Sequence, residues 1–461
     1  MPPALRLGIA RPLDGRPESS PLDVPANHLV THGVVVGMTG SGKTGLVTVL
    51  VEEALRAEVP VLVIDVKGDL PNLLLAFPSF DAAHVTPWLE DGAPAGQAAE
   101  LAEARKRGLE AFGLGAADIT LYAASTYVRV ITPGADAGEM LHVLSSLERR
   151  SSRWDTDVEG ARAALSAAIS LLLRLLGRDP DPARSREHVL LAVLAERRLL
   201  AGESADIAAL LPDVIEPPIA TIGALEVNGF MSKKARRDLA AGLNTLLASP
   251  SFASWRQGST LDVAAWMDPL ETQAGRKTPV TVLSVAHLDD DERALVLGVV
   301  LEEVLTWVRG LPGSQRLKAL VVFDEVYGFL PPHPASPPTK RPLVALMKQA
   351  RAFGVGVVVA TQNPMDLDYR ALSNAGLWCL GRLQTDADRA RILDGLTNEA
   401  HQGQGADELD EVLKNLRPRW FVVRDAQGGT TQLLRPRWAM SWMRGPMTRV
   451  EIRRARKARA G

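Results

Sequence analysis

Residues 37–44 read GMTGSGKT, and these residue types at this spacing can hold a chain of phosphates. Glycines let the backbone curl around a phosphate and present its N–H groups without obstruction by a Cβ atom. A helix beginning at Lys43 would add the positive end of its dipole. Lys43 can then reach the β- and γ-phosphates, and the Thr44 hydroxyl can bind Mg²⁺. A chance glycine-rich turn explains the pattern less well, so we predict phosphate contacts from Gly37, Met38, Thr39, Gly40, Ser41, Gly42, Lys43 and Thr44.

An acidic pair follows an apolar run at residues 320–325, LVVFDE. Four apolar residues predict a buried parallel strand, and ligands bind at the carboxyl ends of such strands. We predict that Asp324 holds the Mg²⁺ shell and that Glu325 polarises the attacking water. Many strands end in acids, and the preceding phosphate loop is what favours the functional interpretation. Two adjacent carboxylates also favour a hydrolase over a metabolic kinase or a signalling GTPase.

A second apolar run, residues 355–363 (VGVVVATQN), ends in the polar side chains of Thr361, Gln362 and Asn363. Such groups fit a sensor of the γ-phosphate or a water-orienting site on the adjacent strand, and Gln362 is the first choice. The alternative is an ordinary polar start of a loop.

Two arginines are candidates for completing a catalytic site. Ring-forming hydrolases supply an arginine to the γ-phosphate from a neighbouring subunit. Arg351 lies in KQARAFG, just before the apolar run at 355–363. Arg382 lies in LGRL, at the end of a later apolar run at 377–383. The alternative for each arginine is an ordinary role at the surface or in a salt bridge.

The elements that must position these residues alternate between strand and helix patterns. A strand at 29–36, a helix at 43–57 and a strand at 61–66 predict the start of a parallel α/β sheet. The sheet resumes with strands at 279–286, 318–323, 355–361 and 377–383 and with helices at 291–309 and 342–353. Strands at 419–425 and 430–435 flank AQGG and predict a hairpin.

The remaining segments complete the expected domain organisation. Apolar residues at helical spacing dominate the middle of the chain and predict a helical insertion at 136–275. It divides the ATPase core into 29–135 and 276–400. A lead-in with one edge strand at 5–9 is expected in 1–28, the hairpin region in 401–448, and a basic tail in 449–461.

Composition excludes several classes of protein. The chain has 461 residues, of which 46% are hydrophobic and 23% charged, so wholesale disorder is excluded. A net charge of −2 excludes a uniformly basic wrapper of nucleic acid. The single cysteine, Cys379, allows no intramolecular disulfide. Neither a signal peptide nor a membrane-spanning segment is recognisable, so we expect a cytoplasmic protein without membrane contact.

Two basic clusters are candidates for contact with nucleic-acid phosphates. One comprises Lys233, Lys234, Arg236 and Arg237 at the start of a predicted helix, and the other lies in residues 449–459. The first cluster could line a pore or face the solvent. For the second, a solvated tail is the leading interpretation, ahead of a phosphate-contacting arm and of membrane-surface binding.

In this order, the motifs GMTGSGKT, VIDVKGD (63–69), VVFDE and ATQNP (360–364) resemble the HerA/FtsK branch of P-loop ATPases. The sequence is most similar to bacterial HerA-like proteins, through runs such as SREHVLLAVL (185–194), LASPSFASW (247–255) and RPRWAMSWMRGPMTR (435–449). The resemblance covers nearly the whole chain. It implies a RecA-like P-loop core with helices on both faces of a mainly parallel sheet, ATP and Mg²⁺ as cofactors, a hexameric ring and double-stranded DNA as the substrate.

The resemblance also implies roles for individual residues. The family's motor residues fall on Lys43, Thr44, Asp324, Glu325 and Gln362, and its arginine in the helix before the ATQ strand falls on Arg351. The VIDVKGD segment places Asp65 and Asp69 near the nucleotide face.

Two departures from the family pattern bear on partners. HerA proper begins with a β-barrel that helps to dock a nuclease, whereas fewer than 30 residues precede the first predicted core strand. A nuclease partner is therefore possible but doubtful. Members of this subgroup also continue past the RGPMTR segment. An ATP-gated scaffold or regulatory ATPase that acts on a protein partner is the competing hypothesis, and stimulation of hydrolysis by DNA separates the two.

Overall fold

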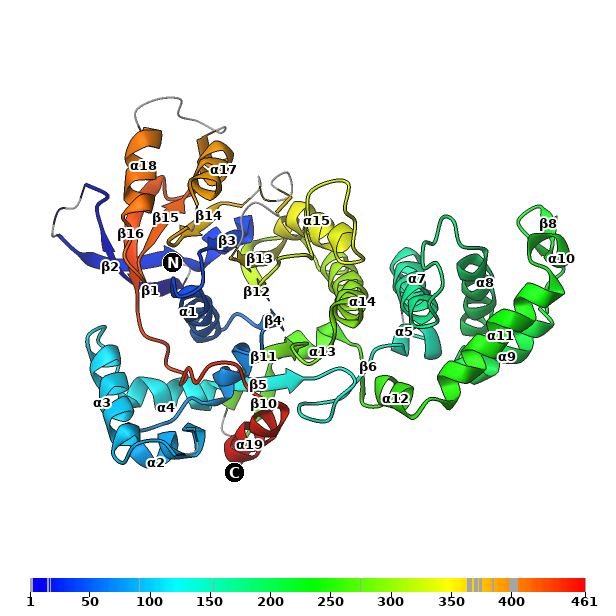
Figure 1. The fold of residues 1–461 in the computed structure, drawn as a ribbon, viewed down its shortest axis with the longest axis horizontal. Coiled ribbons are helices and arrows are strands. Elements are labelled where there is room, and N and C mark those ends of the chain that lie inside the picture. Colours follow the sequence, from blue (N-terminus) through cyan, green and yellow to red (C-terminus); the bar gives the residue numbers. More distant parts are fainter. Residues whose placement is uncertain are drawn as a thin grey trace. The chain divides into compact units, whose positions relative to one another are not determined.

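The computed structural model describes residues 3–14, 16, 18–90, 92–151, 153–273, 275–362, 367–368, 372, 375–383, 385–397 and 405–460. The chain divides into two compact units (Figure 1). The first comprises Met1–Val130, Ala264–His287 and Leu311–Gly461, and the second comprises Ile131–Val263 and Leu288–Gly310. None of the described helices combines the length and the apolar character needed to cross a membrane.

A large mixed sheet forms the centre of the first unit. Its strand order is β10-β11-β4-β12-β13-β3-β14-β15-β16-β1-β2, and β5 also pairs with β11. Six strands, β11, β4, β12, β13, β3 and β14, pair with one another in parallel. At the two ends of this parallel set, β10 pairs with β11 and β15 pairs with β14, both antiparallel. The parallel strands are β3 (Gly33–Val36), β4 (Val61–Asp65), β11 (Gly275–Ser284), β12 (Ser314–Asp324), β13 (Phe353–Thr361) and β14 (Leu377–Leu380).

Valine-rich runs form these central strands because both of their faces are covered. All residues of β3, β4 and β14 are buried, as are the last eight of β13. Such β-branched runs suit a parallel strand that has no solvent face. The register aligns Asp324 with Asp65 and Thr361 with Val36, so the polar ends of several strands meet at one edge of the sheet.

The predicted parallel α/β fold is confirmed, with differences in single elements. Residues 29–31, predicted as strand, belong to the 3₁₀ helix η1 (Ala26–Thr31), and β14 ends at Leu380 rather than at residue 383. Helix α1 (Lys43–Arg56) follows β3 as expected, and α15 (Lys340–Gln349) precedes β13 with the short turn η5 (Ala350–Ala352). Helices α17 (Asp386–Thr397) and α18 (Gly405–Lys414) follow β14.

The N-terminal segment belongs to the sheet and is more than a lead-in with one edge strand. Strand β1 (Ala4–Arg11) pairs with β16 (Thr430–Pro436) and with β2 (Ser20–Pro25), both antiparallel. Strand β16 in turn pairs with β15 (Phe421–Asp425) in the predicted hairpin. Residues from the two ends of the chain therefore extend the same side of the sheet, a pairing that local sequence patterns do not reveal.

Several short elements between β4 and β11 were not predicted individually. They are η2 (Leu70–Leu74), α2 (Ala82–Val85), η3 (Thr86–Trp88), α3 (Gln97–Glu110), α4 (Ala116–Ser125), β5 (Thr126–Ile131), α13 (Val263–Met267) and β10 (Leu270–Thr272).

The second unit is mainly helical, as predicted for the middle of the chain. It contains β6 (Leu141–His142), α5 (Ser145–Glu148), α6 (Arg153–Thr156), α7 (Val158–Leu175), α8 (Arg186–Leu200), α9 (Ile207–Ile215), β7 (Thr221–Ile222), β8 (Leu225–Glu226), α10 (Val227–Phe230), α11 (Lys233–Ala248), α12 (Pro250–Ala253), η4 (Ser254–Arg256), β9 (Ser259–Thr260) and α14 (Asp290–Arg309). Side-chain oxygens of Asp157, Ser185, Asp206 and Ser232 cap its main helices.

The structure divides the chain differently from the sequence at one helix. Helix α14 was assigned to the second part of the core, but it groups with the helical unit, where it packs against α7. Glu303 of α14 also pairs with Arg153 and accepts a hydrogen bond from the Ser146 hydroxyl at 2.7 Å. These contacts are distant in sequence, and the pattern of α14 alone does not show which unit it joins.

The basic C-terminal segment is a packed helix and not a solvated tail. Helix α19 (Arg449–Ala460) buries Ile452 and Ala455 and packs against η2. Arg459 donates hydrogen bonds to the Leu73 carbonyl at 3.0 Å and to the Thr126 hydroxyl at 2.9 Å. Four other cations of this amphipathic helix are exposed, namely Arg449, Arg453, Arg454 and Lys457.

Candidate nucleotide site

The loop at residues 37–42 connects β3 to α1 and has the curled backbone that its glycines predict. Gly40 and Gly42 have φ angles of +80° and +93°, which favour glycine. A Cβ at Gly40 would meet no atom within 4 Å, so the space inside the loop is open. A Cβ at Gly37, in contrast, would lie 2.5 Å from the Ser41 hydroxyl. The loop therefore curls at the start of a helix, where an anion site requires backbone N–H groups.

Lys43 begins α1 and lies beside the acidic end of β12. Its side chain is only 5% exposed, and its Nζ atom lies 3.1 Å from Oε2 of Glu325. Burial lowers the pKa of Lys43, while the carboxylates of Glu325 and Asp324 oppose that effect. The structure thus brings together the predicted phosphate-binding cation and the predicted water-polarising carboxylate.

Both oxygens of Glu325 are engaged. Oε2 contacts Lys43 and also Lys67, whose Nζ lies 2.5 Å away. Oε1 accepts hydrogen bonds from the Thr361 hydroxyl at 3.3 Å and from the Gln362 backbone N–H at 3.2 Å. Although burial raises the pKa of Glu325, the two lysines lower it below its ordinary value overall. The backbone of Glu325 has a φ angle of +66°, an uncommon conformation for this residue type that is typical of functional sites.

Asp324 is buried, and no donor among the described residues reaches its carboxylate. The residue is 1% exposed, and neither of its oxygens has a hydrogen-bond partner among the described residues. Burial raises its pKa to about 6, and Lys43 and Lys67 oppose that effect. A buried, unpartnered carboxylate is costly unless a cation completes it. This observation fits Mg²⁺ held by Asp324 and the Thr44 hydroxyl, because Mg²⁺ takes few protein ligands and completes its shell with phosphates and water.

Lys67 is a site residue that the sequence reasoning missed. It lies in the VIDVKGD segment, where only Asp65 and Asp69 were singled out. Buried Asp65 holds this loop by accepting the Gly68 and Asp69 N–H groups at 2.9 and 3.2 Å and the Ser284 hydroxyl at 3.0 Å. Burial, with Asp324 adding to it, raises the pKa of Asp65 to about 7. Asp65 therefore supports the loop that carries Lys67 to Glu325. The sequence feature that could have revealed this role is the lysine directly after V-I-D-V.

Gln362 lies next to the phosphate loop, as predicted. Its side-chain oxygen accepts a hydrogen bond from the Thr39 hydroxyl at 2.8 Å. Backbone bonds join the same segments, because the Gly37 N–H donates to the Thr361 carbonyl at 3.2 Å. The end of β13 is thereby tied to both the loop and Glu325. Asn363, the third polar residue of that run, lies outside the described residues.

The two arginines occupy different places. The Arg382 carbonyl accepts the Met38 N–H at 2.9 Å, so this residue borders the phosphate loop, and its side chain is exposed. Arg351 lies in η5, before the first residue of β13, whereas Gln362 follows the last. A strand of nine residues spans about 30 Å. Arg351 therefore lies at the opposite edge of the sheet and does not join the site of its own chain.

The fold and the site together define a P-loop NTPase with a RecA-like core. Strand β13 lies between the phosphate-loop strand β3 and the acidic strand β12, as the sheet order shows. The phosphate loop, the acidic pair and Gln362 meet at the carboxyl ends of these three strands.

Residues 11–89 match the family model of the helicase HerA central domain, which covers β3, the phosphate loop, α1 and β4. For this part of the chain, the match confirms the predicted resemblance to HerA-type P-loop ATPases.

One solved structure with a similar fold extends the comparison to the rest of the chain. VirB4 of Thermoanaerobacter pseudethanolicus is 14% identical, with a TM-score of 0.52, over 94% of this chain and 96% of VirB4. The plasmid coupling protein TrwB, in complex with ADP and Mg²⁺, is 15% identical, with a TM-score of 0.49, over 92% of this chain and 91% of that one. At this identity the likeness to VirB4 is one of fold. Curated proteins provide no match to this sequence.

Proposed function

We propose that this protein is a Mg²⁺-dependent ATP hydrolase of the HerA-like class that works as a ring-forming motor on double-stranded DNA. The observation that carries the hydrolase assignment is the placement of Glu325 at 3.1 Å from Lys43, next to the unpartnered carboxylate of Asp324. A phosphate-binding lysine, a metal-binding acid and a second carboxylate for water are the parts that ATP hydrolysis requires.

In this proposal each residue has a separate task. The N–H groups of the loop and Lys43 bind the phosphates, and Lys43 leaves Glu325 to do so. Glu325 then accepts the proton of the attacking water while the bond between the γ-phosphorus and the bridging oxygen breaks. Thr44 and Asp324 would hold Mg²⁺, which supplies charge neutralisation for the phosphates. Gln362, bonded to Thr39, orients the water or responds to the γ-phosphate.

We propose that Arg351 acts in a neighbouring subunit. Its position at the edge of the sheet opposite to the phosphate loop prevents a contact with the ATP of its own chain. In a ring of identical subunits, that edge can face the nucleotide of the next subunit. This position is compatible with the hexamer that we propose. Arg382 borders its own phosphate loop and is the alternative arginine.

The DNA assignment rests on exposed cations of two helices. In α11, Lys233, Lys234 and Arg237 are exposed, whereas Arg236 is buried and donates to the Met231 carbonyl at 2.8 Å. Arg236 is therefore a structural residue, and only the other three cations of the predicted cluster can contact DNA. The exposed cations of α19 form the other group. Both groups can contact phosphates without reading base sequence.

Replacing Lys233, Lys234 and Arg237 together by glutamine is expected to weaken binding of duplex DNA and to leave ATP affinity unchanged. Each phosphate contact contributes roughly 0.9 to the slope of log K against log salt, so the triple variant should have a shallower slope. Fluorescence anisotropy over a salt series measures this slope. The same experiment with Arg449, Arg453 and Lys457 tests α19 without deleting its buried residues.

Wild-type ATP turnover with and without duplex DNA tests the motor assignment directly. We expect stimulation by DNA at low salt. If DNA neither binds nor stimulates turnover, the motor proposal is wrong and an ATP-gated scaffold on a protein partner becomes the better assignment.

Lys67→Met is expected to lower the turnover number about tenfold and to change ATP affinity little. When Lys43 moves to the phosphates, Lys67 stays as the cation in contact with Glu325 and holds the carboxylate against repulsion by the phosphates. Steady-state kinetics separate kcat from KM, and Lys67→Arg should restore most of the activity. Turnover of Lys67→Met at the wild-type rate would contradict this positioning role.

A further inference from the structure

A cavity of about 750 Å³ lies within the first unit, next to the start of α1. Gly42 and Gly45 line it on the side of the phosphate loop, and Arg105 of α3 lines it on another side. A Cβ at Gly45 would meet no atom within 4 Å, so the helix start opens into free space. Because the loop holds the phosphates of a nucleotide at this end of α1, the rest of the nucleotide must lie in a neighbouring space. A volume of this size suits a small molecule.

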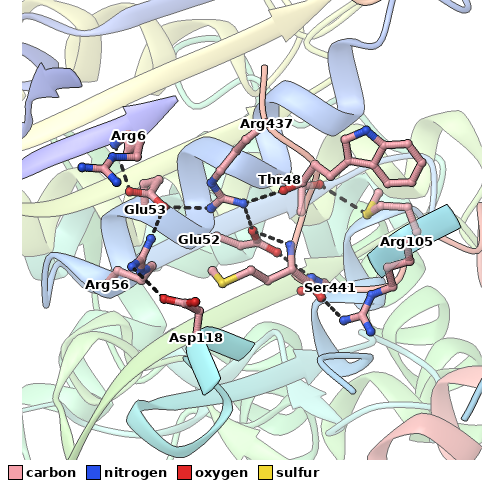
Figure 2. Close-up of polar contacts among 12 residues, drawn as sticks. Arg6, Thr48, Glu52, Glu53, Arg56, Arg105, Asp118, Arg437 and Ser441 are labelled. Atoms are coloured by element: carbon pink, nitrogen blue, oxygen red, sulfur yellow. Dashed lines mark hydrogen bonds and ion pairs between the residues drawn. The ribbon is translucent and has the colours of Figure 1, made fainter. Parts of the chain in front are cut away.

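The segment 436–444, which we call the C-terminal strap, forms the far wall of the cavity. A buried ionic network holds it on α1 (Figure 2). Arg437, whose side chain is 1% exposed, pairs with Glu52 at 2.8 Å and with Glu53 at 2.9 Å. Glu52 also accepts the backbone N–H groups of Met440 at 2.9 Å and Ser441 at 2.8 Å. Removing the strap would take three partners from the buried Glu52 carboxylate, whereas Glu53 would keep Arg56 and the Arg6 N–H, so Glu52 is what positions the wall firmly.

Flat side chains face the cavity from the strap and from the segment before it. Arg419 lies with its guanidinium carbon 4.9 Å from the centroid of the Trp438 ring, and it lines the cavity together with Trp438 and Trp442. Arg419 also has a φ angle of +62°, and its N–H donates to the Ser41 carbonyl at 2.9 Å. It therefore joins the phosphate loop to the strap. Nucleobases stack on guanidinium and aromatic planes of this kind.

An unused hydrogen-bond donor borders the same space. The indole N–H of Trp442 is buried and has no hydrogen-bond partner within the part of the chain that the structure describes. A buried donor of this kind is normally satisfied, and the ring nitrogens of a base or the hydroxyls of a ribose are suitable acceptors. Trp438 is in a different position, because a Cβ at Gly108 of α3 would lie 2.4 Å from its ring. Trp438 is thus packed in place and supports Arg419.

We propose that this cavity binds the purine nucleoside part of the nucleotide, with Arg419 and Trp442 in contact with the base or ribose. The proposal rests on the proposed function, since it requires phosphates at Lys43. It assigns to the C-terminal strap, which lies outside the residues matched by the family model, the task of completing the nucleotide site. A purine is favoured over a pyrimidine because its two rings offer more surface for stacking.

Calorimetric titration with two Mg²⁺-loaded ligands tests the proposal. One ligand is the non-hydrolysable ATP analogue adenylyl imidodiphosphate, and the other is inorganic tripolyphosphate, which lacks the nucleoside. The wild-type protein should bind the analogue at least tenfold more tightly. Trp442→Leu and Arg419→Asn should each weaken the analogue about tenfold, in line with ~1–3 kcal/mol for one stacked base, and should leave tripolyphosphate unchanged. Asparagine is chosen because it tolerates a positive φ.

Matched controls separate stacking from general damage. Trp420→Leu removes a neighbouring tryptophan that contacts Arg11 and does not line the cavity, so it should change neither affinity. Trp442→Phe keeps a flat ring without the N–H donor and should give an intermediate loss; it replaces Trp442→Leu if that variant does not fold.

The outcomes distinguish this proposal from the proposed function. If the wild-type protein binds tripolyphosphate as tightly as the analogue, or if the variants weaken both ligands equally, the cavity is not the nucleoside site and the ATPase proposal stands. If the wild-type protein binds neither ligand, the proposed function itself is wrong.

Discussion

Lys43→Ala is expected to nearly abolish ATP hydrolysis and to weaken ATP binding. Lys43 is buried at the start of α1, and it is the cation that the phosphate loop itself carries toward the β- and γ-phosphates. Its loss removes a charge-assisted contact that no flexible neighbour on the loop replaces. Phosphate release measures hydrolysis, and calorimetry with the non-hydrolysable analogue measures binding.

The fold should survive this substitution, because Glu325 keeps its contacts with Lys67, Thr361 and the Gln362 backbone. Thermal unfolding checks that point. Lys318→Ala is a suitable control, since Lys318 is exposed and its ammonium bonds only to the Pro312 carbonyl among the contacts described. Wild-type turnover in Lys43→Ala would refute the assignment of the phosphate loop.

Glu325→Gln is expected to lower turnover 100-fold or more while ATP binding is retained. Glutamine has nearly the same shape and its carbonyl oxygen can still accept hydrogen bonds from Thr361 and Gln362, but it cannot take a proton from water. A loss of this order is typical when a general base is removed. The variant should accumulate in the ATP-bound, assembled form, which size-exclusion chromatography with ATP measures.

Asp324→Asn is the matched comparison, because it removes the neighbouring charge. It should weaken the dependence of binding on Mg²⁺, whereas Glu325→Gln should not. If Glu325→Gln hydrolyses ATP normally and Asp324→Asn does not, the roles of the two acids have been divided wrongly.

The core of the candidate site could be predicted because its signals are local. The glycines, Lys43 and Thr44 lie within one short segment. Between a buried strand and a helix, that pattern is typical of a phosphate-binding loop. The acidic pair and Gln362 follow apolar runs that predict buried parallel strands, and such strands end at the same edge of a sheet. The structure brings Lys43, Glu325 and Gln362 together accordingly.

Other parts of the molecule depend on contacts between distant segments, which local patterns do not encode. Arg236 resembled its cationic neighbours, and only its burial against backbone carbonyls shows that it is structural. The C-terminal helix is as basic as a solvated tail, yet Ile452 and Ala455 pack it against η2. A charge run does not reveal which of its members has an apolar neighbour from another part of the chain.

Periodicity and short motifs act over a few residues, and they were enough to predict the α/β class, the phosphate loop, the acidic pair and the mainly helical middle of the chain. The contact of Lys67 with Glu325 and the place of Arg351 at the far edge of the sheet depend on how distant segments pack together. The same is true of Arg437, which holds the C-terminal strap against Glu52, 385 residues away along the chain. The contacts of Glu325 and Arg437 follow from burial, since charged groups removed from water must meet partners and the fold determines which partners are within reach. The place of Arg351 follows from the length of β13, which separates it from Gln362.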